Sequence, residues 1–272
     1  MITSASNPRI KALRALSEPR ERRRAGLCLI EGQDEIRFAF TAGTEIQTLF
    51  YAKMSKSFSE NNALMVKICA AGAECTELSP DILARIAYRE HPDALLAIAK
   101  SPPVSLADLE KRLPPTPNHT LVILADVEKP GNIGAALRSL DAAGYDGLIA
   151  ASCQTDLFNP NVIRASRGSV FTVPAAECET EEALTWLKKQ NYVIFALHPG
   201  AGKAYYNYDY RQHQTNNTAF VFGAEHEGLS SVWLQSADIQ LAIPMFGAVN
   251  SLNIAQAVTL ALYEKRRADA FP

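Results

Sequence analysis

Apolar and polar positions follow two different patterns along this chain. Short runs that are apolar at nearly every position are typical of strands buried on both faces, and five such runs occur after residue 120: LVILAD, GLIAAS, YVIFAL, TAFVFGAE and IQLAIPM. Longer stretches with an apolar residue every three or four positions predict helices over 132–143, 181–190 and 251–267. Because predicted strands and helices alternate along the chain, residues 120–272 are predicted to form a parallel sheet with helices on both faces.

The first hundred residues alternate in the same way but more weakly. Helices are expected over 8–16 and 33–42, and strands at LCLIEG and IQTLFYA. After the strand-like run DALLAIAK comes a segment with five prolines, 101–119, which is typical of a linker. The sequence therefore predicts a smaller α/β domain at 1–100, a proline-rich linker at 101–119 and a second α/β domain at 120–272.

Three loops of the second domain carry the candidate chemistry. In a parallel α/β sheet, ligands bind beyond the carboxyl ends of the strands, so the loops that follow the strands are examined first. VEKPGNIGAALRS follows the first strand, GAEHEGLSS follows TAFVF, and IPMFGAVNSLN precedes the last helix. Ser251 is a candidate N-cap of that helix, but capping alone does not account for Asn250 and Asn253 beside it.

The sequence excludes several common kinds of ligand and metal site. There is no G-x-G-x-x-G fingerprint, and HPGAGKA at 198–204 lacks both the first glycine and the final Ser or Thr of a phosphate-binding loop. Glu225, His226 and Glu227 come from one loop, too few elements for a metal site. The five cysteines form no C-x-x-C pair, so we expect neither zinc nor a disulfide framework, but thiols in a reducing compartment.

Charge is distributed unevenly along the chain. Residues 1–24 hold seven Lys or Arg against two Glu, although the whole chain has a net charge of −2. Such a run is either a solvated helix face or a phosphate-binding patch, and its composition leaves both open. The candidate phosphate-binding residues are Arg9, Arg20, Arg22, Arg23 and Arg24. Because no signal-peptide core and no apolar run of membrane-spanning length occurs, we expect a cytoplasmic protein.

Taken together, the loops resemble a known family. N-x-G-A-x-x-R-S at 132–139, F-G-A-E-x-x-G-L-S at 222–230 and I-P-M-x-G-x-x-x-S-L-N at 243–253 resemble the three motifs of the SpoU/TrmH RNA ribose methyltransferases of the SPOUT superfamily. FNPNVIRASRGSVFTVP at 158–174 resembles a fourth segment of that family. The start of the chain is similar to the substrate-binding domain that precedes the catalytic domain in many members, which implies that the five arginines named above bind RNA.

This resemblance implies a fold, a cofactor and a partner. The family has a deep trefoil knot near its C-terminus, binds S-adenosylmethionine in the knot loops, requires no metal and is typically a homodimer with the site beside the interface. By position, the cofactor-binding residues are Gly223, Ile243 and Leu252. The polar active-site residues are Asn132, Arg138, Glu225, Ser251 and Asn253.

The implied reaction is transfer of a methyl group from S-adenosylmethionine to a ribose 2′-hydroxyl of structured RNA, ribosomal RNA more than tRNA. The family proposal gives Arg138 a part in deprotonation. Because a guanidinium stays charged in proteins, we favour a role in gripping a phosphate and stabilising the developing alkoxide. Glu225 would orient Asn132 or an arginine. Two alternatives are a non-catalytic RNA-binding protein with the same fold and a base methyltransferase of the same superfamily.

Overall fold

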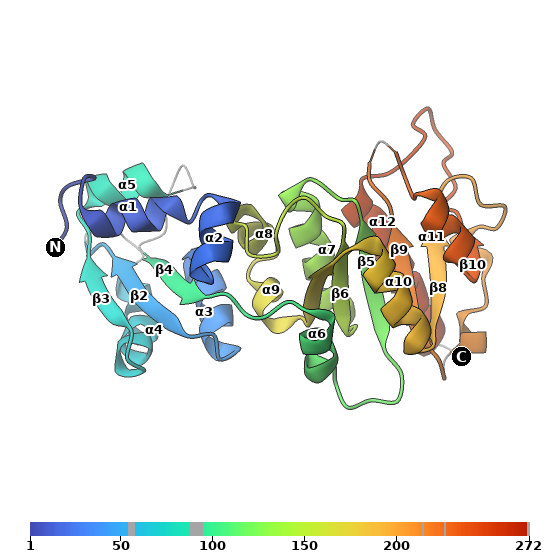
Figure 1. Ribbon diagram of the computed structural model, residues 1–272, viewed down its shortest axis with the longest axis horizontal. Helices are drawn as coiled ribbons and strands as arrows, with labels where there is room; N and C mark the ends of the chain where they lie inside the picture. The colour runs from blue at the N-terminus through green and yellow to red at the C-terminus, as the bar shows by residue number, and fades with distance from the viewer. Residues whose placement is uncertain (54–57, 88–94, 214, 226, 271–272) are drawn as a thin grey trace. The chain divides into compact units, whose positions relative to one another are not determined.

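The computed structural model describes residues 1–53, 58–87, 95–213, 215–225 and 227–270 (Figure 1). Contacts divide the chain into two compact units. The first consists of Met1–Pro102 with Phe158–Thr172, and the second of Pro103–Leu157 with Val173–Pro272. Each unit has a sheet and a core of its own.

The first unit is built on a four-stranded mixed sheet. Its strand order is β1 (Leu27–Glu31), β4 (Leu95–Lys100), β2 (Ile46–Tyr51) and β3 (Glu74–Glu77). Strand β4 is antiparallel to both of its neighbours, whereas β2 and β3 are parallel. Helices α1 (Pro8–Ala15) and α5 (Pro80–Ile86) bury their apolar side chains on one face, and Figure 1 shows α3 (Gln33–Thr41) and α4 (Phe58–Ala70) on the other. The α/β character is as predicted, but β3, α4 and α5 were not foreseen.

A segment of the predicted second domain packs in this first unit. Helix α8 (Pro160–Ala165), which lies within the NPNVIRASRG motif, contacts β1, and α9 (Ser169–Thr172), which follows the motif, contacts α3. Arg167 pairs with Asp34 at 3.0 Å. A Cβ on Gly168 would lie 3.0 Å from the Cα of Glu35, so this turn presses directly against the α3 backbone. The motif is thus used for packing onto the N-terminal unit.

The predicted linker contains a short helix. Helix α6 (Leu106–Arg112) is capped at its N-terminus by Ser105, whose hydroxyl oxygen accepts a hydrogen bond from the backbone N–H of Asp108 at 3.2 Å. Leu109 is fully buried in the core of the second unit. Part of the proline-rich segment is therefore built into the second unit.

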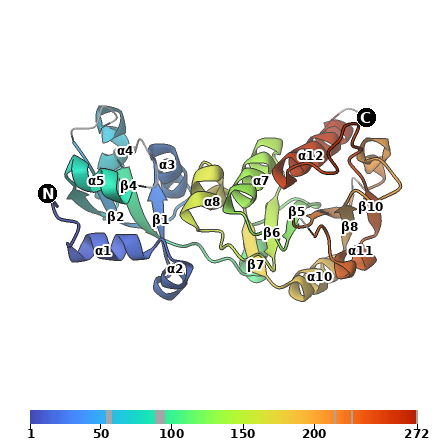
Figure 2. The same ribbon diagram turned by 90° about the horizontal axis from the view of Figure 1, so that it is seen from above.

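The second unit contains the predicted parallel sheet. The strand order is β10 (Ile239–Leu241), β8 (Tyr192–Leu197), β9 (Asn217–Phe222), β5 (Thr120–Ala125), β6 (Gly147–Ala151) and β7 (Ala175–Cys178). All neighbouring pairs are parallel, which confirms the prediction. Figure 2 shows α10 (Thr180–Lys189) and α11 (Ser231–Ser236) on one face and α7 (Pro130–Ala143) and α12 (Ile254–Ala270) on the other. The trefoil knot stays a prediction.

Helix α12 begins later than predicted. The side-chain oxygen of Asn253 accepts a hydrogen bond from the N–H of Ala255 at 3.0 Å, and its carbonyl accepts one from Ala257. Asn253 is therefore the N-cap, and the prediction that Ser251 caps this helix is wrong. This leaves Ser251 in the loop before the helix. In the parts of the chain that the structure describes, no helix is both long and apolar enough to cross a membrane.

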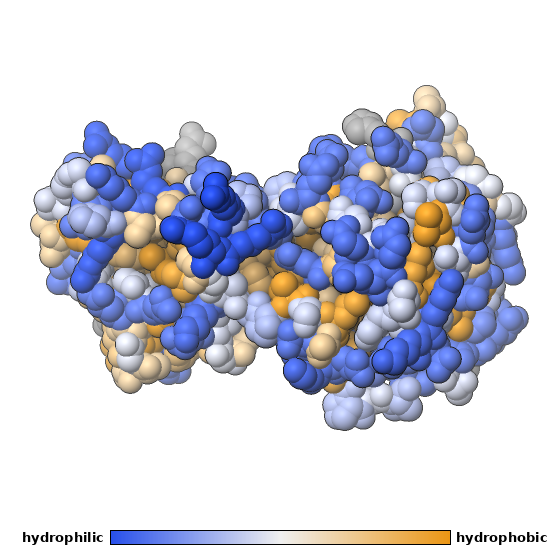
Figure 3. All heavy atoms as spheres, viewed as in Figure 1, coloured by the Kyte–Doolittle hydropathy of each residue, from blue (hydrophilic) through white to orange (hydrophobic). Residues whose placement is uncertain are grey.

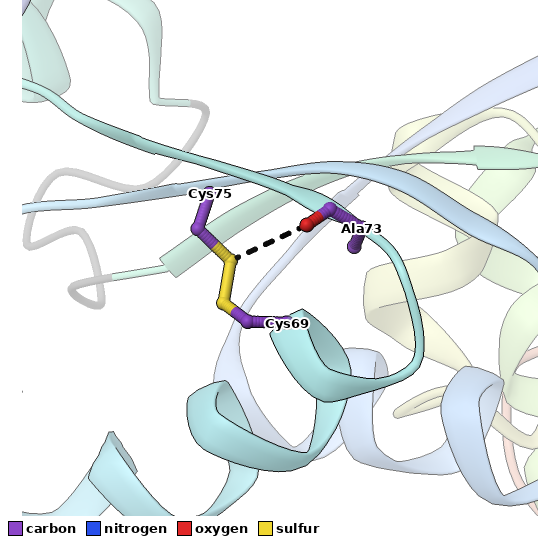
Figure 4. Close-up of a disulfide and its surroundings, with 3 residues drawn as sticks. All are labelled: Cys69, Ala73 and Cys75. Carbon is purple, nitrogen blue, oxygen red and sulfur yellow. Dashed lines mark hydrogen bonds between the residues drawn. A yellow bond between two sulfur atoms is a disulfide. The ribbon is translucent and has the colours of Figure 1, made fainter.

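One disulfide joins Cys69 to Cys75, contrary to the prediction that these cysteines stay as thiols (Figure 4). Cys69 lies in the last turn of α4 and Cys75 in β3. The turn between them passes through Gly72 at φ +103°, which brings the two Cα atoms to 6.1 Å, a separation suited to a disulfide. The pattern of cysteine spacing could not reveal this, because it depends on how the helix meets the edge strand.

Candidate active site

A cavity of about 350 Å³ lies at the carboxyl ends of β8 and β9 and beside the loop between β10 and α12. This is the edge of a parallel sheet at which ligands are expected. Its walls are mostly apolar, with contributions from Leu197, Phe222, Leu229, Ile243, Leu252 and Ile254. Its rim carries Glu225, Glu227, Asn250 and Ser251. The volume and the mixed lining are typical of a site for a small organic ligand.

The three predicted cofactor-binding residues meet in this cavity. Gly223 follows β9, Ile243 follows β10, and Leu252 precedes α12, and all three line it. Gly223 is also pressed against its own loop, because a Cβ there would lie 2.2 Å from the carbonyl carbon of Gly228. The glycine is therefore needed to fold the loop as well as to shape the cavity.

A chain of hydrogen bonds joins three of the predicted catalytic residues. The side-chain N–H of Asn253 donates to the amide oxygen of Asn132 at 3.0 Å, and the Asn132 N–H in turn donates to Glu225. The Asn253 oxygen already accepts from Ala255, so the direction of both amides is fixed. The other carboxylate oxygen of Glu225 accepts from the ammonium of Lys129. Residues from α7, from the loop after β9 and from the start of α12 thus form one network.

Arg138 and Ser251 are not part of this network. Arg138 lies on an exposed side of α7 and, within the described ranges, makes no hydrogen bond or ion pair. Ser251 is exposed and lines the cavity without a hydrogen-bond partner among the described residues. Both side chains are therefore available to a substrate.

Carboxylates give this end of the sheet a negative character. Glu225 and Glu227 line the cavity, and Asp126 lies in the loop after β5 at φ +58°. Burial, and secondarily the charges of Glu227 and Glu179, raise the pKa of Asp126 above its usual value. The carboxylates of Glu225 and Glu227 on the cavity wall favour a ligand with positive charge.

Sequence reasoning missed Lys129 and His198. His198, the first residue after β8, lines the cavity, and its Nε2 lies 3.0 Å from the side-chain oxygen of Gln240. Both residues lie in segments that follow strands, VEKPGNIGAALRS and HPGAGKA, but neither belongs to one of the recognised motifs. Among the residues that the structure describes, no group of three His, Cys, Asp or Glu side chains could hold a metal. His226 lies outside the described residues.

The basic N-terminal residues belong to the first unit, and one of them does not fit its prediction. Figure 3 shows hydrophilic side chains gathered over α2 (Pro19–Ala25), where Arg20, Arg23 and Arg24 are exposed. Arg22 is only 2% exposed, and its guanidinium donates to the carbonyls of Leu16 at 2.8 Å and Ser17 at 2.7 Å. The prediction that Arg22 binds RNA is therefore wrong, because its charge joins α2 to the end of α1.

Arg9 is exposed but already paired. Its guanidinium lies 2.5 Å from a carboxylate oxygen of Glu74 and donates to the hydroxyl of Thr76 at 3.1 Å. These contacts tie α1 to β3. Phosphate binding by Arg9 stays a prediction, and it would have to compete with this ion pair.

The motifs and the cavity can be compared with known proteins. Residues 119–263 match the SpoU rRNA Methylase family, and residues 7–97 match the MRM3-like substrate binding domain. The chain belongs to the SpoU rRNA methylase family. The resemblance of the motifs is therefore confirmed over more than half of the sequence.

Similar members of the SpoU rRNA methylase family span nearly the whole chain. A 23S rRNA (uridine(2479)-2′-O)-methyltransferase of Streptomyces viridochromogenes is 30% identical over 97% of this chain and 91% of its own length. The crystal structure of an RNA 2′-O ribose methyltransferase is 35% identical and has a TM-score of 0.84 over 99% of both chains. An AdoMet-bound rRNA methyltransferase from Sinorhizobium meliloti is 29% identical, with a TM-score of 0.86 over 98% of this chain and 97% of that one. The two-unit α/β architecture is thus shared with these methyltransferases.

Proposed function

We propose that this chain transfers a methyl group from S-adenosylmethionine to a ribose 2′-hydroxyl of RNA, and that ribosomal RNA is a better substrate than tRNA. One observation carries the proposal: a cavity lined by Gly223, Ile243 and Leu252 lies beside a polar network of Asn132, Glu225 and Asn253. A ligand site and a set of oriented polar groups are therefore present at one edge of the sheet. The 2′-O chemistry and the ribosomal substrate of similar proteins support the assignment.

The residues of the cavity suit the proposed cofactor. Apolar side chains such as Leu229 and Ile243 offer walls for an adenine ring, and Glu225 and Glu227 offer negative charge to a sulfonium. When bound, S-adenosylmethionine supplies a methyl group on an excellent leaving group. The trefoil knot implied by the family resemblance, and the cytoplasmic location expected from the sequence, belong to the same proposal.

The protein's own contribution is to orient the acceptor. Asn132 and Asn253 have fixed amide directions, so they can present defined donors and acceptors to a ribose. Arg138, exposed and unpaired among the described residues, would hold the neighbouring phosphate and stabilise the alkoxide as the 2′-hydroxyl loses its proton. Ser251 would contact the ribose from the loop before α12.

The test is labelled-methyl transfer to ribosomal RNA and tRNA isolated from cells that lack the gene. Digestion to nucleosides and mass spectrometry then locate the methyl group. We expect a ribose-methylated nucleoside from ribosomal RNA. A methylated base would support the base methyltransferase instead, and RNA binding with no transfer would support the non-catalytic alternative.

The exposed arginines of α2 provide a test of the RNA-binding role of the first unit. Replacing Arg20, Arg23 and Arg24 with alanine should weaken RNA binding and reduce its salt dependence, because each lost phosphate contact lowers the log–log slope by about 0.7–0.9. Binding is measured by fluorescence anisotropy at several salt concentrations. An unchanged affinity and slope would mean that the run is only a solvated helix face.

Arg22→Ala serves as the contrasting variant. Because Arg22 is buried and donates to two backbone carbonyls, its loss should destabilise the first unit by about 2–4 kcal/mol. Chemical denaturation measures this change. The salt slope of RNA binding by the protein that is still folded should stay as in the wild type.

We also propose a homodimer that forms through α12. Before Glu264 this helix exposes Gln256, Leu260 and Tyr263, and the last two are apolar side chains that are 38% and 48% exposed. Leu260→Glu should therefore shift a dimer toward monomer at micromolar concentration, as measured by sedimentation. Val66→Glu, at an apolar position on α4 that is 58% exposed, is the matched control and should leave the assembly unchanged. A wild-type monomer under these conditions would refute the proposal.

A further inference from the structure

Lys129 is the residue immediately before α7, and no motif singled it out. Its ammonium pairs with a carboxylate oxygen of Glu225, which lies 96 residues further along the chain. The lysine side chain is 66% exposed and the glutamate side chain 21% exposed. Lys129 does not line the cavity, so it does not meet the cofactor there. Lys129 instead contacts the polar network through Glu225, from a position that is not part of the cavity lining.

The hydrogen bonds of the network run in one order from donor to acceptor, and this order ends on the residue that Lys129 contacts. Asn253 donates to Asn132, and Asn132 donates to one oxygen of Glu225. One carboxylate oxygen of Glu225 thus accepts from Asn132, and the other accepts from Lys129. With both oxygens held, the carboxylate has one orientation, and the orientation of the Asn132 amide follows from it.

We infer that Lys129 is a positioning residue for methyl transfer: it fixes Glu225, and through Glu225 it fixes the amides of Asn132 and Asn253 toward the ribose. This inference rests on the proposed function. The lysine end of this pair is well exposed, so we expect the pair to contribute little to folding and to act through alignment. Misalignment of a catalytic group by about 1 Å can cost up to about 100-fold in rate.

The test uses the full-length protein with Lys129→Met, which keeps the length of the side chain and removes its charge. We expect the kcat of methyl transfer to fall by about 10- to 100-fold, with the KM for RNA and the affinity for S-adenosylmethionine nearly unchanged. Lys129→Arg should restore most of the rate, because a guanidinium can still donate to the carboxylate. A failure of the arginine variant to restore the rate would count against the inference.

A matched control comes from the same unit. Lys111 pairs with Asp108 at 3.5 Å, with side chains 75% and 27% exposed. It lies on α6, which packs against β7, whereas the cavity lies near β8 and β10 at the other end of the sheet. Lys111→Met should therefore leave kcat unchanged. A second measurement is the double variant with Glu225→Gln, in which loss of Lys129 should add no further effect if it acts through Glu225.

Three further outcomes would overturn the inference. Unchanged kcat in Lys129→Met would make the pair an ordinary surface contact. A higher KM with a salt slope lowered by about 0.7–0.9 would make Lys129 an RNA phosphate contact. Additive losses in the double variant would show that Lys129 acts independently of Glu225. Failure of the proposed function is distinguishable from all three, because the wild-type protein would then transfer no methyl group to ribose.

Discussion

Replacing Arg138 with alanine should reduce methyl transfer to RNA by roughly 10²–10³-fold while cofactor affinity stays nearly unchanged. Arg138 lies outside the cavity, on the exposed side of α7, so the cofactor loops do not depend on it. Its guanidinium, with no hydrogen bond or ion pair in the described parts of the chain, is available to grip a substrate phosphate. Loss of a group that acts on the developing alkoxide lowers kcat rather than ground-state binding of the cofactor.

Single-turnover methyl transfer and calorimetry with S-adenosylmethionine check this expectation. Arg138→Lys should restore little activity, because a point charge lacks the planar fork that holds a phosphate. Lys188→Ala removes a positive charge from an exposed position on α10, on the opposite face of the sheet, and should leave the rate unchanged. Full activity in Arg138→Ala, or a loss of cofactor binding, would contradict the assigned role.

The strands of the second unit were predictable because burial on both faces leaves a strong pattern. YVIFAL gave β8 with both ends correct. The ends of strands were predicted less well where apolar residues continue into a loop. TAFVFGAE extends past β9, which ends at Phe222 before the turn at Gly223. In the first unit, β3 is an edge strand with the sequence ECTE, and no apolar run marks it.

Part of the site was predictable because the recognised motifs lie in the loops that form it. Gly223, Ile243 and Leu252 come from three loops and meet in one cavity, as the resemblance implied. The individual contacts were not predictable, since they depend on tertiary distances. Lys129 meets Glu225 only because β5 and β9 are neighbours in the sheet.

Local sequence also fails to show which charged side chain points inward. PRERRR gives four arginines in one short helix, and only the fold directs Arg22 to the carbonyls of Leu16 and Ser17 while Arg23 and Arg24 stay exposed. Composition alone therefore could not separate Arg22, which is buried in the fold, from the exposed arginines that stay candidates for RNA binding.

Replacing Gly223 with valine should weaken S-adenosylmethionine binding by about 100-fold or more. A Cβ at this position would lie 2.2 Å from the carbonyl carbon and oxygen of Gly228 and 2.4 Å from the backbone nitrogen of Leu229. The neighbour is backbone and cannot swing aside, so the strain exceeds the 1–3 kcal/mol that is usual for overpacking. Because about 1.4 kcal/mol equals tenfold in affinity, a displaced loop of this kind removes most of the binding.

Calorimetry measures the loss, and the control is another glycine of the same unit. Gly202 lies in the exposed loop after β8, where an added Cβ would meet nothing within 4 Å, so Gly202→Val should bind the cofactor as the wild type does.

Thermal unfolding separates a displaced loop from a collapsed unit, because the core strands do not involve Gly223. The structure gives the physical cause of the expected loss: the absent side chain of Gly223 lets the backbone of Gly228 and Leu229 pack against the start of the loop, and all three residues line the cavity. Wild-type cofactor affinity in a folded Gly223→Val protein would show that the loop is not required for binding.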